Sequence, residues 1–591
     1  MSVPRENLRV VGGLADDPAH RNNGSTEDAA VSAGGVETNQ TGAPRTDATA
    51  PAEAPPGELL VQSEAAPLEV PAPKAAVPVG TEIELKLLVD PEQLAHFNEA
   101  QIIAANARGN GTRKHLKSVY YDTPGRALWE NGLSLRVRQS GTRFAQTVKA
   151  EASDDPLRRG EWEASVPSMA PDLALAAPFM PAKLRDDLQL QPVEAVFTSD
   201  IHRHQRLVDL PSGTVEVAFD HGVLKAGVRS TPVAEIELEL KAGHASAIYE
   251  LALRLAEHGA VRPSIRTKSA RGFDLAADAA PTAEKPRKLR VEPAASLDDT
   301  FAAILRECLR HLLQSLPAAE HGGDPEGVHQ LRVALRRLRS AFNLLRAAGA
   351  SSRLEGFREE AGWLAQNLST ARDLDVFQGS TLPVIAEACS GIVGFDVLST
   401  ATEQRRGDAY RKVREVLAGR RCAAFVLGLG SFIETRGWRS DVAPEALGQL
   451  AEPAANFARR VLAIQHLKVL KRGRHLKSLG AEQRHRLRLA VKKLRYLADF
   501  LLPLCAEGKA AKRFAHRLAD LQEELGAFND MATTAKVLES LGAETAGGGT
   551  AAAAITGWQA HGMVGAEPRL RGAWKEFAEV KPPWVVEAPA Q

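Results

Sequence analysis

The sequence predicts a multidomain protein, in which an α+β domain dominated by antiparallel strands is followed by an all-α domain of two repeated helical units. Residues 81–275 contain many short segments in which apolar and polar residues alternate with period two. Residues 296–540 change to long amphipathic helical patterns. This second region also repeats itself at an offset of 156 residues, from His329 to His485.

Composition sets the outer limits of the domains. The first 80 residues contain no Phe, Trp or Tyr and hold 11 acidic against 5 basic residues, which predicts a disordered tail. A Pro-rich polar stretch separates the two folded regions and predicts a linker. We therefore expect a tail over 1–79, a strand-rich domain over 80–276, a linker over 277–295, a helical domain over 296–540 and a C-terminal extension over 541–591, with a Gly/Ala stretch, a short helix and a loose end.

The predicted strands follow one another through the first domain. They are TEIELKLLV, SVYYDT, LSLRVRQ, RFAQTVKA, EWEASV, TVEVAFDHG and AEIELELKA. Between them, PEQLAHFNEAQ and ASAIYELALRLAEHG have the pattern of helices. We expect these elements to form an α+β domain dominated by antiparallel strands.

Charged residues nearly fill one face of several of these strands. Glu82, Glu84 and Lys86 alternate with apolar residues, and the other strands repeat the pattern with Arg136, Arg138, Glu163 and the glutamates at 235, 237 and 239. For a single strand, a solvated outer face explains this pattern best. For the whole set, a closed or nearly closed barrel with a charged lumen is the better explanation.

Such a lumen has the groups needed for phosphoryl transfer. Carboxylates hold hard divalent cations, and Arg and Lys hold a multiply charged anion. The chain contains no GxxxxGK[ST] motif, so a P-loop enzyme is excluded.

The segment 80–275 resembles the CYTH, or triphosphate tunnel metalloenzyme, family. The similarity rests on Glu82-x-Glu84-x-Lys86, YYDT, LSLRVR, TVK, EWE, VAFDHG, EIELEL and TKSARG, which follow one another in the family's order. Within the family the segment looks most like bacterial inorganic triphosphatases. Other members act on thiamine triphosphate, cyclise ATP or act on RNA 5′-triphosphates.

The resemblance implies an eight-stranded tunnel that binds triphosphate with Mg²⁺ or Mn²⁺. It implies metal-binding roles for Glu82, Glu84, Glu163, Asp220, Glu237 and Glu239. It implies an anion path and catalytic roles for Lys86, Arg136, Arg138, Lys149, Arg203 and Lys268. Whether Arg203 or Arg206 points inward stays open.

Basic residues form a stripe on one helix in each half of the repeat. The stripes are His329, Arg332, Arg336 and Arg339 in the first copy and His485, Arg488, Lys492 and Arg495 in the second. A solvated surface explains one such stripe, but its recurrence without acidic partners at i,i+4 favours a phosphate-rich ligand. Residues 301–540 hold 37 basic against 26 acidic residues, which also favours a polyanion.

HQLRVALRRLRS and ARDLDVF resemble the CHAD domain, a helical module associated with inorganic polyphosphate. DNA is the main alternative ligand, but we find no helix-turn-helix or aromatic stacking motif. We therefore expect polyphosphate, and not nucleic acid, as the partner of these helices.

Together these features predict an enzyme, a metal-dependent inorganic triphosphatase with a polyphosphate-binding domain. The alternatives are a non-catalytic polyphosphate-binding or granule-associated protein and a phosphohydrolase acting on thiamine triphosphate or a nucleotide. The four Cys have no metal-ligand spacing, and the sequence has no apolar run of signal-peptide or membrane-span length. We expect a cytoplasmic protein without a membrane partner, with polyphosphate granules as an alternative setting.

Overall fold

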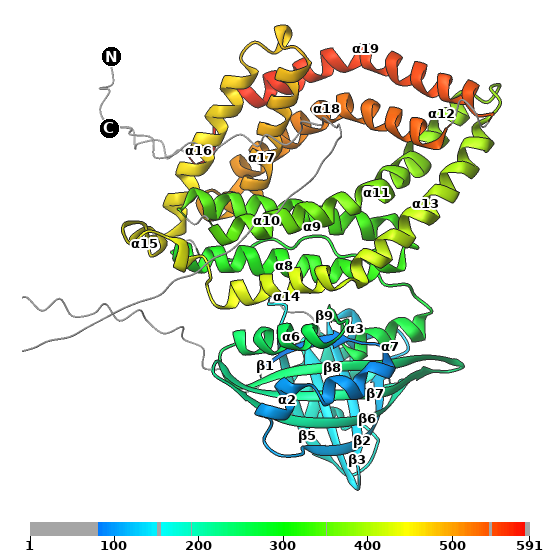
Figure 1. The fold of residues 1–591 in the computed structure, drawn as a ribbon, viewed down its shortest axis with the longest axis vertical. Coiled ribbons are helices and arrows are strands. Elements are labelled where there is room, and N and C mark those ends of the chain that lie inside the picture. The colour runs from blue at the N-terminus through cyan, green and yellow to red at the C-terminus, as the bar shows by residue number, and fades with distance from the viewer. Residues whose placement is uncertain are drawn as a thin grey trace, which may run out of the picture. The chain divides into compact units, whose positions relative to one another are not determined.

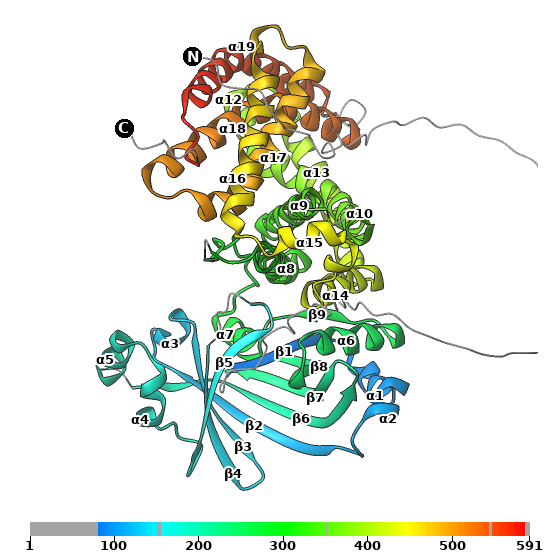
Figure 2. The same cartoon turned by 90° about the vertical axis from the view of Figure 1, so that its left-hand side faces the viewer.

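The computed structural model describes residues 81–150, 155–190, 192–292, 294–349, 352–542 and 547–584. The predicted N-terminal tail therefore lies outside the described residues. Figures 1 and 2 show a strand-rich part in blue to green and a helical part in green to red.

Eight antiparallel strands close into a barrel, as predicted. The strands are β1 (Thr81–Leu88), β2 (Thr112–Asp122), β3 (Leu133–Ser140), β4 (Arg143–Ala150), β5 (Arg158–Val166), β6 (Glu194–Leu210), β7 (Gly213–Ala226) and β8 (Arg229–Gly243). Their order is β5-β4-β3-β2-β6-β7-β8-β1, and β1 pairs with β5 to close the ring. A short strand, β9 (Arg262–Ser264), adds to the other half of β1.

The alternation in β1 separates a core outside the barrel wall from a charged interior. Ile83, Leu85 and Leu87 are at most 2% exposed and belong to the core. The same core contains the apolar face of α6 (Ser246–His258), including Leu251. Burying these side chains fixes the register, because a slip of one residue would turn the apolar set into the lumen.

Short helices complete this part of the chain. They are α1 (Leu94–Asn98), α2 (Gln101–Asn106), α3 (Ala127–Glu130), α4 (Leu173–Ala176), α5 (Ala182–Leu190) and α7 (Lys268–Ala277), with 3₁₀ turns at Pro91–Gln93 and Ala177–Phe179. Helix α7 packs on β6 through Gly272, where a Cβ atom would lie 2.0 Å from the Phe197 ring. Only glycine fits at this contact.

The second part is all helical, as predicted. Its first half contains α8 (Leu297–His321), α9 (Pro325–Ala347), α10 (Ser352–Asn367), α11 (Ser369–Val376), a π-turn (Phe377–Thr381), α12 (Leu382–Ala388), α13 (Phe395–Ala418) and α14 (Arg420–Glu434). Its second half contains α15 (Pro444–Leu450), α16 (Ala454–Gly473), α17 (Ala481–Cys505), α18 (Gly508–Leu541) and α19 (Gly549–Glu579), with 3₁₀ turns at Arg439–Asp441 and Leu476–Ser478.

The predicted repeat corresponds to two helical hairpins, α8–α9 and α16–α17. At the start of each copy, Ser296 and Pro453 form an antiparallel bridge. One turn further, the rings of Phe301 and Phe457 meet edge to face at 5.7 Å. Equivalent positions touch each other, as an approximate two-fold arrangement requires.

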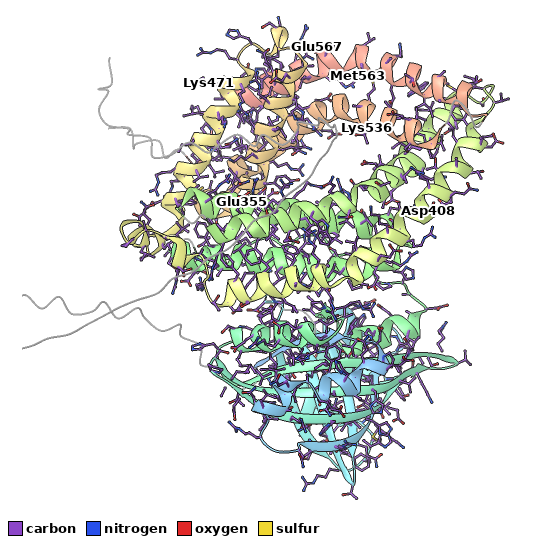
Figure 3. The ribbon with its side chains drawn as sticks, viewed as in Figure 1. Glu355, Asp408, Lys471, Lys536, Met563 and Glu567 are labelled. Carbon is purple, nitrogen blue, oxygen red and sulfur yellow. The ribbon has the colours of Figure 1, made fainter. Side chains whose placement is uncertain are left out.

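The C-terminal extension differs from the short helix that the sequence predicts. Helix α19 has 31 residues and runs along α18; Figure 3 labels Lys536 on α18 and Met563 and Glu567 on α19. Its Phe577 packs with Phe514 of α18 around the ring of His466. The sequence predicts only a short helix here, but the alanines of the Gly/Ala stretch supply helix propensity and small packing surfaces at the start of α19.

Among the described residues, no single helix is both long and apolar enough to cross a bilayer. Helices α13 and α14 meet this threshold only as a pair, across a bend of 52°.

Candidate functional site

The barrel interior encloses a polar cavity of about 370 Å³. Its lining comes from β1 to β8 and from the start of α7. Of the residues that the sequence predicts here, the lining includes Glu82, Glu84, Lys86, Arg136, Arg138, Lys149, Glu163, Arg203, Glu237, Glu239 and Lys268. The structure thus gathers, from six strands and one helix, nearly every predicted tunnel residue.

Asp220 is the exception, because it lies behind the lining. It is fully buried, and Arg203 donates two hydrogen bonds to its carboxylate, at 2.7 and 2.6 Å. The structure also resolves the ambiguity between Arg203 and Arg206. Arg203 points inward, whereas the Arg206 side chain is directed to the carbonyl oxygen of Asn110.

Lys268 sits at the centre of a buried, charge-balanced network. Thr267 caps the N-terminus of α7 by accepting a hydrogen bond from the Ala270 N–H, and this cap fixes the adjacent Lys268. The Lys268 ammonium contacts Asp220 at 2.7 Å, Glu237 at 2.9 Å and also Glu235.

Two arginines complete this network. Arg203 contacts Asp220 and Glu237, and Arg271 contacts Glu235 at 2.6 Å. Burial acts to lower the pKa of Lys268, but the three carboxylates outweigh it and raise that pKa. Three cations therefore neutralise Asp220, Glu235 and Glu237.

A second group of carboxylates carries surplus negative charge. Lys149 donates to Glu82 at 2.6 Å and lies 3.0 Å from Glu161. Burial, followed by the repulsion of Glu84, raises the pKa of Glu82 to about 7. Glu239 also has a raised pKa, caused first by burial and further by Glu216 and Glu84, despite its contact with Lys241 at 2.6 Å.

Glu84 lies between these two groups. It is 4% exposed, accepts a hydrogen bond from Arg159 at 2.9 Å and contacts Lys86. Burial acts to raise its pKa, but Lys86, Lys149 and Arg159 outweigh burial and lower the pKa to about 2. Glu84 is therefore ionised over the whole physiological range.

One guanidinium in the cavity lacks an acidic partner. Among the described residues, Arg138 forms no ion pair, and its Nε lies 3.4 Å from the Ser118 hydroxyl. Burial, with the repulsion of Arg136 and Arg203, lowers the pKa of Arg138 to about 10. Arg136 is held loosely, at 3.5 Å from Glu161. This side of the tunnel is therefore prepared for an anion.

The basic stripes of the two helical units converge. Burial, followed by the repulsion of Arg488 and Arg336, lowers the pKa of Lys492 to about 8. The Arg336 Nε of α9 donates to the Tyr496 hydroxyl of α17 at 2.9 Å, which joins the two copies. The buried Nε atoms of Arg332 and Arg488 have no hydrogen-bond partner within the part of the chain that the structure describes. Four cations thus lie close together, with Asp373 near Arg332 and Asp530 near Arg488 and Lys492 as the carboxylates that partly balance them.

Three other members of the predicted stripes, Arg339, His485 and Arg495, take positions outside this group of four cations. His329 lies close to the group. Arg339 lies near Glu355 of α10 and lowers the pKa of that carboxyl, after Arg358 and Arg346. His485 lines a separate hollow with Arg484 and Arg488, and Arg495 lies near Asp499. His329 is close to the converging cations; burial and then Arg372 lower its pKa.

Comparison with known families agrees with the division of the chain into a strand-rich part and a helical part. Residues 80–273 match the model of the CYTH domain, and residues 303–539 match the model of the CHAD domain. The chain carries a CYTH domain followed by a CHAD domain.

The CYTH domain is similar to an inorganic triphosphatase of Haemophilus influenzae, with 27% identity over 194 residues, or 33% of this chain and 54% of the relative. An uncharacterized protein of Mycobacterium tuberculosis is 25% identical over 332 residues, or 52% of this chain and 60% of the relative. The chain thus spans little more than half the length of these relatives. The crystal structure of the CHAD domain from the plant Ricinus communis shares 27% identity, with a TM-score of 0.45 over 51% of this chain and 98% of that one.

Sequence reasoning missed several residues of the CYTH tunnel. They are Lys114, Arg159 and Glu216, whereas Glu161 and Lys241 were placed on the charged strand faces but were given no role in the site. Glu161 and Arg159 share the inner face of β5 with Glu163, so the alternation of that strand contained the signal. In the CHAD domain, Arg372 was quoted as part of the ARDLDVF motif but not placed in the site.

Proposed function

We propose that the CYTH domain hydrolyses inorganic triphosphate with a divalent metal ion, Mg²⁺ or Mn²⁺, in the reaction PPPi + H₂O → PPi + Pi. One observation carries the proposal: within the described part of the chain, one cavity contains both a surplus of carboxylates and an arginine without an acidic partner. An anion bound together with a cation would satisfy both groups.

The carboxylates suit a hard cation. Glu82, Glu84, Glu163 and Glu239 line the cavity, and two of them have raised pKa values that a divalent cation would relieve. When bound, the metal would neutralise phosphate charge and withdraw electrons from the phosphorus. Asp220 and Glu237 would have a different role, because Arg203 and Lys268 already neutralise them and they shape the end of the pocket.

The cations would clamp the phosphoryl oxygens. Arg138 and Arg136 offer guanidinium forks, and Lys86 and Lys149 offer point charges. Ion pairs hold Lys86 and Lys149 in place before substrate binds, so these two groups would stabilise the charge that develops at the terminal phosphate without reorganising. A carboxylate of the lining, such as Glu163, would orient the attacking water.

The lining favours PPPi over a nucleotide or thiamine triphosphate. Tyr120 is the one aromatic residue of the described lining, and it is 3% exposed and stacked on Phe197 at 4.2 Å. It therefore offers no free face to a base. We expect the kcat/KM of PPPi to exceed that of ATP and thiamine triphosphate.

The test measures phosphate release from PPPi, ATP and thiamine triphosphate with saturating Mg²⁺ and with EDTA. Metal-dependent turnover with preference for PPPi supports the proposal. A tunnel that binds PPPi without releasing phosphate would instead make the protein a polyphosphate-binding protein, and a preference for another triphosphate would reassign the substrate.

We further propose that the CHAD domain binds inorganic polyphosphate where Arg332, Arg336, Arg488 and Lys492 converge. Mutual repulsion among these partly buried cations disfavours the unliganded state, and a bound polyanion would offset this repulsion. His329 and Arg372 would extend the surface on the side of the first unit.

Full-length protein is the right material for this test, because α19 packs into the CHAD core and a chain ending at residue 540 would lose that contact. Binding to immobilised polyphosphate should fall steeply with salt. Replacing Arg332 and Arg336 with Gln, or Arg488 and Lys492 with Gln, should each weaken binding, and the quadruple change should nearly abolish it. Loss of thermal stability with unchanged binding would leave the stripes as scaffold.

A further inference from the structure

A row of three histidines crosses the outer wall of the CYTH barrel. His115 of β2 pairs in register with His202 of β6, and His202 pairs with His221 of β7. Their neighbours Lys114 and Arg203 line the cavity, so the histidines occupy the opposite face. All three are exposed.

The rings lie close enough to act together. The His115 and His202 rings are stacked with centroids 4.3 Å apart and an interplanar angle of 5°, and His202 and His221 follow at 5.2 Å. Directly opposed residues of an antiparallel pair bring their Cβ atoms to about 5 Å, which is what a shared ligand needs.

A carboxylate completes the group. The His115 Nε2 lies 2.6 Å from an Asp200 carboxylate oxygen. Ligand atoms of His115, Asp200 and His202 all lie within 4.8 Å of one another. The hydrogen bond from His115 is the main cause that lowers the pKa of Asp200.

We propose that His115, Asp200 and His202 form a site for a divalent transition-metal ion, with Zn²⁺ as its representative, on the outer wall of the barrel. Two imidazoles and a carboxylate form a ligand set typical of Zn²⁺ and related ions, and small rotations of exposed side chains bring them to bonding distance. His221 is placed beside His202 as a fourth donor. The all-oxygen ligands of the tunnel select hard cations, so this outer site would take a different class of metal.

The site would also link strands that carry tunnel residues. A metal held by His115 and His202 would join β2 to β6. On β6, Arg203 lies between His202 and His204 in the sequence, and its side chain projects into the cavity. Occupancy would therefore stiffen the part of the wall from which Arg203 reaches Asp220. This proposal does not depend on the reaction in the tunnel.

The test is calorimetric titration of the full chain with Zn²⁺ in excess Mg²⁺, which keeps the tunnel occupied by a hard ion. Wild type should bind one more Zn²⁺ than the His115→Ala/His202→Ala variant. Asp200→Asn should weaken that site by about tenfold, since it removes one of three ligands. The thermal unfolding temperature of wild type, but not of the double variant, should rise with Zn²⁺.

A matched control comes from the same domain. His96 and His258 also form an exposed ring pair, 6.4 Å apart, but the His96 Nε2 faces a backbone carbonyl and not a carboxylate. The His96→Ala/His258→Ala variant should keep the extra Zn²⁺. With Cu²⁺ as probe, electron paramagnetic resonance should show nitrogen coupling in wild type and lose this coupling in the His115/His202 variant. Equal Zn²⁺ stoichiometry in wild type and the His115/His202 variant would overturn the proposal.

Discussion

Glu82 and Lys149 form an ion pair at 2.6 Å inside the CYTH tunnel, and the Glu82 carboxyl still has a pKa of about 7. Burial raises this pKa, and Glu84 and Glu161 add repulsion that one lysine does not cancel. Because the pKa is above its usual value of 4.5, the folded protein loses stability from this group as pH rises from about 5 to about 7. Relief of this repulsion is what a bound cation would supply.

Metal binding should therefore release a proton from Glu82. At about pH 6 the carboxyl is mostly protonated, and a divalent cation binds its ionised form, whereas above about pH 8 no proton remains to be released. Calorimetry of Mg²⁺ binding at about pH 6 should give an apparent enthalpy that depends on the ionisation enthalpy of the buffer. Glu82→Gln should remove this dependence, and a buffer-independent enthalpy in wild type would contradict the assignment.

Glu163→Gln should separate metal binding from folding more cleanly than Glu84→Gln. Among the described residues Glu163 forms no ion pair, and its nearest polar partner is the Thr147 hydroxyl at 3.4 Å. The change should weaken Mg²⁺ binding and PPPi hydrolysis by about tenfold or more at unchanged thermal stability.

Glu84→Gln should lower both activity and stability, because it leaves Arg159 and Lys86 as buried cations without this carboxylate. The measurements are calorimetry, a phosphate-release assay and thermal unfolding. Equal thermal stability of the Glu84→Gln and Glu163→Gln variants would show that the ion pairs of Glu84 contribute little to folding.

Arg138→Gln should lower kcat/KM for PPPi by about a hundredfold without destabilising the protein. Removing one preorganised donor to developing charge has about this effect on catalysis. Arg138 forms no ion pair within the described part of the chain, and relieving its repulsion with Arg136 and Arg203 should preserve stability.

Lys268→Met is the contrasting variant, because it leaves three buried carboxylates with fewer cations and should cost about 3–5 kcal/mol of unfolding free energy. Steady-state kinetics and thermal unfolding distinguish the Arg138→Gln variant from the Lys268→Met variant. A large stability loss in the Arg138 variant would mean that this arginine is structural.

The sequence predicted the barrel well where one face of a strand is apolar. In β1 the alternation of Ile83, Leu85 and Leu87 with charged residues identified both the strand and its inner face. Strand β6 was not named among the strands, since its exposed face carries His202 and His204 and lacks the apolar signal. Where both faces of a strand are polar, as from His202 to Arg206, the strand is recognised only through the neighbours with which it pairs.

Sequence could not distinguish which charged residues are already neutralised. Asp220 and Glu163 look alike in the pattern, but Arg203 and Lys268 neutralise Asp220 behind the cavity lining, whereas Glu163 forms no ion pair among the described residues. The partners come from β6 and α7, far along the chain, so only the folded arrangement gives the local charge balance. The same holds for Arg339, which follows the helical stripe but lies near Glu355.

Polyphosphate binding by the CHAD domain should weaken as pH rises through the range in which Lys492 titrates. Burial, with the repulsion of Arg488 and Arg336, lowers the pKa of Lys492 to about 8 in the free protein. A lysine with a lowered pKa loses its charge earlier, so one phosphate contact disappears between about pH 8 and about pH 10. Because the polyanion favours the charged form, binding near pH 8 should take up a proton.

Lys492→Arg provides the control, since a guanidinium stays charged over this range. Wild type should lose affinity for polyphosphate between about pH 8 and about pH 10, and the slope of log K against log salt should decrease by about one in magnitude. The arginine variant should show a flat profile over the same range. Retention on a polyphosphate matrix at several salt concentrations measures both quantities. An identical pH dependence in the two proteins would place the titrating group elsewhere and remove Lys492 from the binding surface.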